Sequence, residues 1–289
     1  MLSGVAIVDK PAGWTSHDVV AKARGLLGTR KVGHSGTLDP DATGVLVLGV
    51  GRATRLLTYL SGLDKTYTGE VVLGVATSTL DAAGEVTGTW DMSAVGVDEV
   101  RRAAKELTGE LLQVPPMVSA KKVGGQRLHA LARQGVEVER EAVAVRVDRF
   151  DVGETGEPGV FKVSVACSSG TYVRSLAADL GAELGGGAHL RDLRRTAVGP
   201  YTLDDAVPLD QLAPERVLPP VEALRGRPRA IVDGDLLAAV RNGKVLPADA
   251  LGVEGEGPWA VVDPGGELVA VYQRHRGDQV KPGVVIPAN

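Results

Sequence analysis

Residues 33–50 read GHSGTLDPDATGVLVLGV, a polar loop that runs directly into an almost unbroken apolar stretch. The apolar part, residues 45–50, is typical of a buried strand. The loop before it, residues 33–44, is rich in glycine and contains a proline, so its backbone can approach a ligand closely. Because catalytic residues often lie on loops held by a rigid element, we expect a functional loop anchored on a core strand.

Asp39 is the candidate reactive group of this loop. The proline that follows it disfavours a helical backbone at Asp39 and presents the side chain from an extended chain. With an ordinary pKa of about 3.9, its carboxyl group would be ionised at neutral pH. It could then act as a nucleophile or as a base. A simple Asp-Pro turn that joins two elements explains the same residues equally well.

Two other chemical interpretations of this region are disfavoured. Residues 39–43 fit the D-x-D-x-T pattern of phosphotransferases that form an aspartyl-phosphate, but those enzymes place the aspartate after a buried strand. Here the strand follows the motif, so the order is wrong. Residues 49–51 resemble the start of a dinucleotide-binding loop, yet Thr54 stands where the third glycine should be.

The remaining periodicity predicts a mixed α+β fold. A strand is expected at residues 5–8, and a helix begins at a capping box formed by Thr15 and Asp18. Residues 30–44 are expected to form a loop. Further strands are expected at residues 66–75 and 161–167, further helices at 98–108, from 173 onward and at 233–241, and a hairpin at 259–272. The domains are expected at residues 1–210 and 229–289, with a proline-rich linker at 211–228.

The composition excludes several classes of protein. The chain has 289 residues, of which 44% are hydrophobic and 24% are charged, so disordered, collagenous and coiled-coil proteins are disfavoured. Its longest uncharged stretch, residues 163–173, is shorter than the roughly 20 residues of a membrane helix. The single cysteine, Cys167, excludes an internal disulfide and a multi-cysteine metal site, and is expected to be a small buried hydrophobic residue. With no signal peptide visible, we expect a soluble cytoplasmic protein.

Charge is distributed unevenly along the chain. The net charge is −4, and residues 196–289 account for all of it. Three windows carry a positive excess, namely residues 1–70, 117–149 and 171–195. A fold that brings these windows together would create a basic face suited to nucleic acid, although excesses this small also arise by chance.

Six ordered motifs together resemble the TruB family of tRNA pseudouridine synthases. Residues 33–44 are similar to its G-H-x-G-T/A-L-D-P-x-A-T/S-G loop, which carries the family's aspartate nucleophile. The other motifs, in family order, are K-P-x-G-x-T-S within residues 8–16, D-K-x-Y at 64–67, Q-x-P-P-x-x-S-A from 113 with its continuation at 131–135, C-S-x-G-T-Y-I/V-R-x-L at 167–176, and L-R-R at 193–195. Together they span about two thirds of the chain.

The resemblance implies a fold and a reaction. The fold would be α+β, with a mixed, mainly antiparallel sheet in a catalytic domain of the pseudouridine synthase type and a small β-rich PUA-like C-terminal domain. The reaction would detach uracil from its ribose, rotate it and rejoin it through carbon, with the nucleotide flipped out of its stack. Whether the aspartate attacks the base or the sugar stays open.

The resemblance also assigns roles to individual residues. Asp39 would be the nucleophile, and Arg174 would pair with the aspartate and keep it ionised. Tyr67 would stack on the flipped base and take part in proton removal. Tyr172 would be a second tyrosine of the pocket, although either tyrosine could instead be a packing residue and Arg174 a surface residue. His34 would fill the gap left by flipped loop bases. Lys10 and Pro11 would brace the pocket, and Lys10 would also belong to the RNA-binding surface. Candidate phosphate contacts are Arg55, Lys121, Lys122, Arg127, Arg194 and Arg195, each of which could be ordinary surface.

The expected partner is therefore tRNA, modified at uridine 55 in the T loop without cofactor or metal. We expect the protein to be a monomer that needs no protein partner and does not bind membranes. The two alternatives are an RNA-folding chaperone that uses the same pocket without turnover, and the guide-RNA-dependent branch of the family, which the short N-terminus disfavours. Two departures stand out: Val118 replaces an aromatic residue found in many relatives, and the acidic C-terminal region argues against a strong grip on phosphates.

Overall fold

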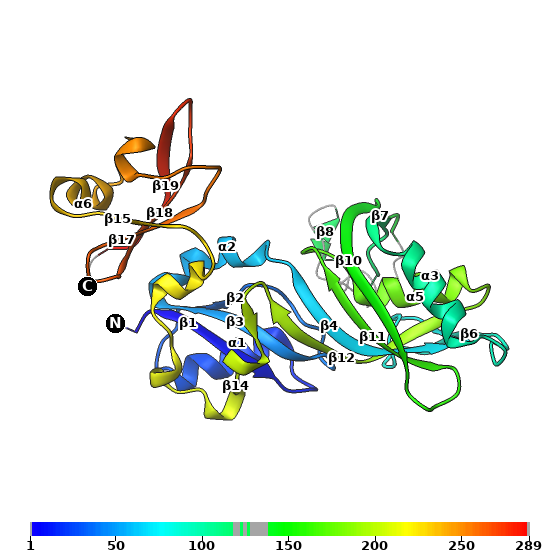
Figure 1. Cartoon of the computed structure of the whole chain (residues 1–289). Helices are drawn as coiled ribbons and strands as arrows, with labels where there is room; N and C mark the ends of the chain where they lie inside the picture. The colour runs from blue at the N-terminus through cyan, green and yellow to red at the C-terminus, as the bar shows by residue number, and fades with distance from the viewer. Residues whose placement is uncertain (1, 118–121, 124–125, 128–137, 288–289) are drawn as a thin grey trace.

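Two large sheets form the frame of the part of the chain that the structure describes (Figure 1). The computed structural model describes residues 2–117, 122–123, 126–127 and 138–287. In this part of the chain a ten-stranded sheet is joined at one end to a five-stranded sheet, and helices pack against both. The fold is therefore α+β, as expected.

The large sheet is mixed and mainly antiparallel. Only the pairs β1–β14 and β3–β12 are parallel among its described strand pairs. In spatial order its strands are β14 (Val207–Pro208), β1 (Gly4–Lys10), β3 (Thr43–Val50), β12 (Ala188–Val198), β4 (Lys65–Leu73), β11 (Val160–Cys167), β10 (Val143–Glu154) and β7 (Gly109–Gln113), with β2 (Val32–His34) beside β3 and β13 (Tyr201–Thr202) beside β12.

Helices cover both ends of this sheet. Helix α1 (Ser16–Leu26) begins at the expected capping box, in which the Thr15 hydroxyl accepts from the Asp18 amide and the Asp18 carboxylate accepts from the Thr15 amide. It buries Val19, Val20 and Ala23 against β1 and β3. Helices α3 (Val97–Glu106) and α5 (Val173–Glu183) pack on β4, β10 and β11 in a second core, where the apolar side chains of β4 face the helices.

The shorter elements lie around this frame. Next to β3 are the 3-10 helix η1 (Gly51–Leu56) and helix α2 (Leu57–Ser61). The small hairpins and 3-10 helices are β5 (Val75–Thr77) with β6 (Val86–Thr89), β8 (Lys122–Val123) with β9 (Gln126–Arg127), η2 (Leu203–Asp205), η3 (Leu209–Gln211), η4 (Pro214–Arg216), η5 (Pro220–Leu224) and η6 (Asp249–Leu251).

The second sheet contains the expected C-terminal hairpin and helix. Its spatial order is β15 (Arg229–Ile231), β17 (Trp259–Val262), β18 (Leu268–Arg274), β19 (Gln279–Val285) and β16 (Leu246–Pro247), with α6 (Gly234–Arg241) packed on it. It shares a hydrophobic cluster with β1, β3 and η1. None of the helices in the described ranges is both long and apolar enough to cross a membrane.

Two segments differ from the expectation. Residues 32–34, expected to lie in a loop, form strand β2, because the chain folds back and pairs antiparallel with β3 from Val32 opposite Val50 to His34 opposite Leu48. Residues 211–228 are not an extended connection. They form 3-10 turns that bury apolar side chains, and Leu218 bridges to Val5 of β1.

Strand β12 connects the functional loop to the centre of the sheet. It runs parallel to β3, with Arg195 opposite Gly44, and antiparallel to β4, with Arg195 opposite Tyr67. Gly44 has a φ of 103°, and a Cβ atom there would lie 2.1 Å from the Arg195 carbonyl oxygen. Only glycine permits this close approach, so the loop that ends at Gly44 is fixed beside β12.

Candidate functional site

The loop that carries Asp39 is held from below by a buried lysine. Lys10 has no exposed surface, and its Nζ atom donates to the carbonyl oxygens of Pro11 at 3.0 Å, Trp14 at 2.6 Å and Pro40 at 2.7 Å. Burial lowers the pKa of Lys10 to about 8. The geometry fits the expected bracing role. It corrects the assignment of Lys10 to the RNA-binding surface, since its side chain is fully enclosed.

A buried serine fixes the backbone immediately before Asp39. The Leu38 amide donates to the Ser16 hydroxyl oxygen at 2.8 Å, and that hydroxyl donates to the Leu38 carbonyl oxygen at 3.1 Å. Ser16 is 1% exposed and lies in the first turn of α1. Both polar atoms of Leu38 are thus satisfied without water, which holds the next residue in place.

Arg195 supports the other side of the loop. Its guanidinium group donates to three carbonyl oxygens, those of Val45 at 2.7 Å, Gly36 at 3.2 Å and Thr37 at 3.4 Å. The residue is 1% exposed. Arg195 is therefore enclosed beside the loop and lines the cavity instead of standing on an open surface, and its expected contact with phosphate stays a prediction.

The loop forms one wall of a cavity of about 330 Å³. The other walls come from the end of α2, strand β4, the turn before α5 and strand β12. The charged and aromatic residues that line it are Asp39, Lys65, Tyr67, Tyr172, Arg174 and Arg195. The three residues expected to be catalytic, at positions 39, 67 and 174, therefore lie in one cavity although they come from three separate motifs.

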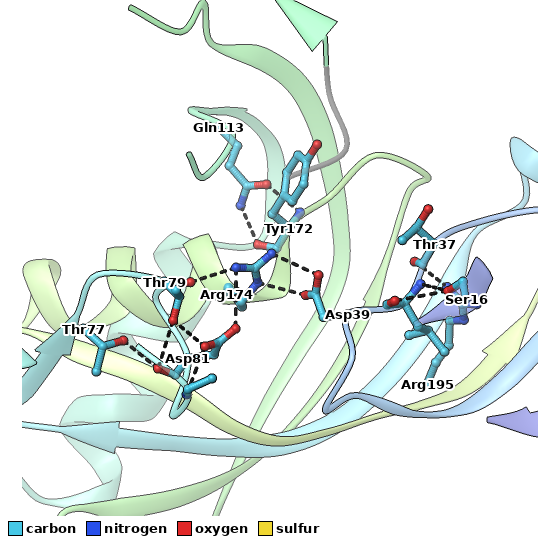
Figure 2. Close-up of polar contacts among 12 residues, drawn as sticks. Ser16, Thr37, Asp39, Thr77, Thr79, Asp81, Gln113, Tyr172, Arg174 and Arg195 are labelled. Carbon is cyan, nitrogen blue, oxygen red and sulfur yellow. Dashed lines mark hydrogen bonds and ion pairs between the residues drawn. The ribbon is translucent and has the colours of Figure 1, made fainter. Parts of the chain in front are cut away.

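Arg174 holds the Asp39 carboxylate through both of its oxygens (Figure 2). The Nε atom lies 2.9 Å from Asp39 Oδ2, and Nη2 donates to Oδ1 at 3.1 Å. The Arg174 side chain is 5% exposed, whereas that of Asp39 keeps 38% of its surface exposed. The guanidinium plane thus fixes the orientation of a carboxylate that stays accessible from the cavity.

A second carboxylate holds Arg174 from the opposite side. Arg174 Nη1 donates to the Thr79 carbonyl oxygen at 2.8 Å and lies 3.5 Å from Asp81 Oδ2. The turn between these residues places Leu80 at a φ of 63°, a conformation that side-chain-bearing residues rarely adopt. The network Asp39–Arg174–Asp81 was not expected, because Asp81 lies in none of the recognised motifs.

Burial raises the pKa of the Asp39 carboxyl group above its ordinary value, and Asp81 adds to the rise. Arg174 and Lys10 oppose it. The ordinary pKa assumed from the sequence was therefore too low. A raised pKa makes the carboxylate a stronger base and nucleophile, provided that the solution is basic enough to ionise it.

Tyr67 is 7% exposed and lines the cavity beside Asp39. Burial raises the pKa of its phenol from the ordinary value, and the positive charge of Arg195 opposes this rise. The phenol is therefore protonated at neutral pH and offers the cavity a neutral aromatic wall.

Tyr172 precedes α5, and the buried side chain of Gln113 fixes its backbone. The Tyr172 amide donates to Gln113 Oε1 at 2.7 Å, and Gln113 Nε2 donates to the Tyr172 carbonyl oxygen at 3.1 Å (Figure 2). This contact joins the motif that begins at Gln113 to the start of α5. It thereby orients both Tyr172 and Arg174.

Among the other expected RNA contacts, the described side chains at positions 34, 55 and 194 do not line the cavity. His34 on β2 stacks edge-on against His17 with 5.4 Å between ring centroids, and burial lowers its pKa, so it is neutral near pH 7. Arg194 donates to both oxygens of Asp9, at 3.1 and 2.7 Å, and Arg55 is exposed and donates to the Val285 carbonyl oxygen at 2.9 Å. Lys121 and Val118 lie outside the described residues, and for Lys122 and Arg127 only the backbone strands are described.

Replacing Ser16 by alanine should loosen the loop without touching the cavity. The two polar atoms of Leu38 would lose their partner, so we expect the free energy of unfolding to fall by about 1–2 kcal/mol. We also expect kcat to fall roughly 3–10-fold, because small displacements of a catalytic group are costly, while KM changes little. Denaturant unfolding and steady-state kinetics measure both. Ser93→Ala, at an exposed serine, is the control, and an unchanged kcat for Ser16→Ala would contradict the positioning role.

Sequence comparison finds relatives along the entire chain. Residues 24–173 match the sequence family described as TruB family pseudouridylate synthase (N terminal domain), and residues 174–224 match the tRNA pseudouridylate synthase B C-terminal domain. A protein named tRNA pseudouridine synthase B from Arthrobacter sp. (strain FB24) is 49% identical, over 100% of this chain and 98% of that protein. Its namesake from Streptomyces coelicolor is 50% identical, over 95% of this chain and 94% of that protein.

Solved structures show the same fold. A chain in the crystal structure of a Cbf5-Nop10-Gar1 complex matches with a TM-score of 0.76 and 28% identity, over 98% of this chain and 85% of that one. A chain in the archaeal box H/ACA sRNP Nop10-Cbf5 complex matches with a TM-score of 0.73 and 26% identity, over 99% and 87% of the two chains. The likeness therefore includes the C-terminal sheet as well as the sheet that carries the cavity.

Proposed function

Because the chain belongs to the TruB family of tRNA pseudouridine synthases, we propose that it isomerises uridine 55 in the T loop of tRNA with Asp39 as the nucleophile. The enzyme is an isomerase that forms pseudouridine in tRNA. The position in tRNA and the role of the aspartate are the proposed parts. The observation that supports them is the Asp39 carboxylate, held through both oxygens by buried Arg174 in a cavity that also contains Tyr67.

The proposed chemistry needs only groups that the cavity contains. The bond between N1 of uracil and C1′ of ribose breaks, and a bond between C5 and C1′ forms. C5 loses a proton and N1 gains one, so no atom or electron is added. Asp39 would attack either the base or C1′ and would leave again when the new bond has formed. The neutral ring of Tyr67 would stack on the flipped base and keep it beside the carboxylate.

Arg174 would serve this chemistry in two ways: it would fix the orientation of the Asp39 carboxylate, and its positive charge would favour the ionised form. A carboxylate that is bound through both oxygens cannot rotate away from the substrate. The positive charge also opposes the rise in the pKa of Asp39 caused by burial. An RNA chaperone without turnover would not need such a paired carboxylate, because a negative charge in the cavity repels the phosphates of RNA. The enzyme is therefore the better explanation of the cavity.

We propose that the protein acts alone in the cytoplasm on the T arm of tRNA, with the C-terminal sheet in a supporting role. The test is incubation of the purified protein with an unmodified tRNA transcript in the presence of EDTA, followed by mapping of pseudouridine. Pseudouridine at position 55 is expected from the single protein without additives. Product at another uridine, or binding of tRNA without product, would contradict the proposal, and the second result would favour the chaperone.

A further inference from the structure

Lys65 is a cavity residue to which the mechanism above gives no role. It lies on β4 two residues before Tyr67, so both side chains point to the same face about 6–7 Å apart along the strand. Its stem passes close to the loop, because a Cβ atom on Gly36 would lie 3.5 Å from Lys65 Cε. The residue is 8% exposed and lines the cavity.

The ammonium group of Lys65 has a donor left over. It donates to the carbonyl oxygens of Leu63 at 2.7 Å and Ser61 at 3.3 Å. An ammonium group has three N–H donors. Lys10, the other deeply buried lysine of the site, uses its three donors on three carbonyl oxygens. Lys65 therefore differs from Lys10 in having one donor available to a ligand in the cavity.

The cavity also contains positive charge that the described residues do not neutralise. Arg174 is paired with Asp39 and Asp81, but neither Lys65 nor Arg195 has a carboxylate within ion-pair distance in the described part of the chain. Buried charge without a counter-charge is unfavourable. The charge of Lys65 is accordingly destabilised: burial and then Arg195 lower its pKa to about 8, while Cys167 and Asp64 oppose this weakly. An anion in the cavity would relieve this cost.

We propose that Lys65 binds a phosphodiester oxygen adjacent to the flipped nucleotide. This inference rests on the proposed function, because the anion is part of the RNA that enters the cavity. The phosphates are the anionic groups of a uridine in RNA, whereas the carbonyl oxygens of uracil are neutral and would leave the excess charge uncompensated. Lys65 would thus hold the backbone of the flipped nucleotide while Tyr67 holds its base.

The test compares removal of the charge from the protein with removal of the charge from the RNA. The substrate is a stem-loop RNA with the T arm sequence, in which a neutral methylphosphonate replaces the phosphate on the 5′ or the 3′ side of the target uridine. We expect one replacement to raise the Kd for the wild-type protein about 10-fold, the usual size of a charge-assisted contact. Lys65→Met should show a similar loss on native RNA and no further loss on the methylphosphonate RNA.

Two further variants make the result decisive. Lys105→Met removes an exposed lysine of α3. This variant should match the wild-type protein both in its affinity for native RNA and in its loss of affinity for methylphosphonate RNA. If Lys65→Met does not fold, Lys65→Gln replaces it, because its amide can still donate to the carbonyl oxygens of residues 61 and 63. Lys65→Gln should then lose affinity for native RNA and lose no more on the methylphosphonate RNA. The proposal would be overturned if the loss of affinity caused by Lys65→Met multiplied with the loss caused by the methylphosphonate when both changes are present. It would also be overturned if the wild-type protein bound both methylphosphonate RNAs as tightly as native RNA. Lys65 would then have only a structural role.

The same samples separate this inference from the proposed function. Pseudouridine formation by the wild-type protein on native RNA is measured alongside binding. If product forms at the target uridine but no coupling with Lys65 is found, only the phosphate contact is refuted. If no product forms, the proposed function itself is refuted.

Discussion

Replacing Asp39 by asparagine is expected to reduce pseudouridine formation by about 10⁴-fold or more, the size of loss seen when an essential group of a catalytic unit is removed. The amide has nearly the same shape as the carboxylate, and its oxygen can still accept a hydrogen bond from Arg174. It cannot, however, form and break a bond with the substrate as a carboxylate does. Single-turnover measurement of pseudouridine in an unmodified tRNA transcript gives the rate.

Binding should survive this substitution. Asp39→Asn removes a negative charge from a cavity that receives RNA, so the Kd for tRNA should be unchanged or slightly lower. The control is Asp41→Asn, which removes an exposed carboxylate two residues further along the same loop. It should retain activity within a few-fold of the wild type. Product formation by Asp39→Asn at more than a hundredth of the wild-type rate would exclude Asp39 as the nucleophile.

The sequence predicted those parts of the site where the local pattern of apolar, turn and capping residues and the family motifs indicate the same structure. The part of the loop at residues 35–42, the strand after it and the capping box at Thr15 all follow from short-range rules, and the structure confirms the α+β fold built around them. The motifs also placed Asp39, Tyr67 and Arg174 in one site, because each residue lies in a motif that contributes to the same pocket in the family that the chain resembles. The geometry agrees with this expectation, although their roles remain predictions.

The misses have a common physical cause, namely contacts between residues far apart in the sequence. Strand β12 was not predicted, because its charged residues interrupt the apolar alternation; two of them, Arg194 and Arg195, are satisfied by Asp9 and by the loop carbonyls. The same contacts bury Arg195 beside the loop, a placement that its sequence motif alone does not indicate. Asp81 gave no signal, since its importance depends on Arg174, which lies more than ninety residues later.

Replacing Arg174 by glutamine is expected to lower kcat/KM at neutral pH by about 10²–10³-fold, since one preorganised donor group is often worth this much. The substitution leaves Asp39 and Asp81 facing each other without the charge between them. Because the Asp39 side chain keeps 38% of its surface exposed, the two carboxylates stay partly solvated, and we expect the free energy of unfolding to fall by less than the about 3–5 kcal/mol typical of a fully buried pair. Arg174→Lys should recover little of the kcat/KM that Arg174→Gln loses, because one ammonium group cannot contact both oxygens of Asp39 and the Thr79 carbonyl oxygen.

The pH dependence separates loss of charge from loss of fold. Asp39 must be ionised to act, so activity is lost as the pH falls through its pKa, and that pKa is already raised by burial. Without Arg174, the pKa of Asp39 rises further, and the acid limb of kcat/KM should move to higher pH. Asp81→Asn removes a charge that raises the same pKa, so its acid limb should move to lower pH even though kcat falls through poorer placement of Arg174. Opposite shifts in the two variants are the expected signature, because general damage to the fold would not give them opposite signs. Shifts in the same direction would refute the electrostatic role of the Asp39–Arg174–Asp81 network.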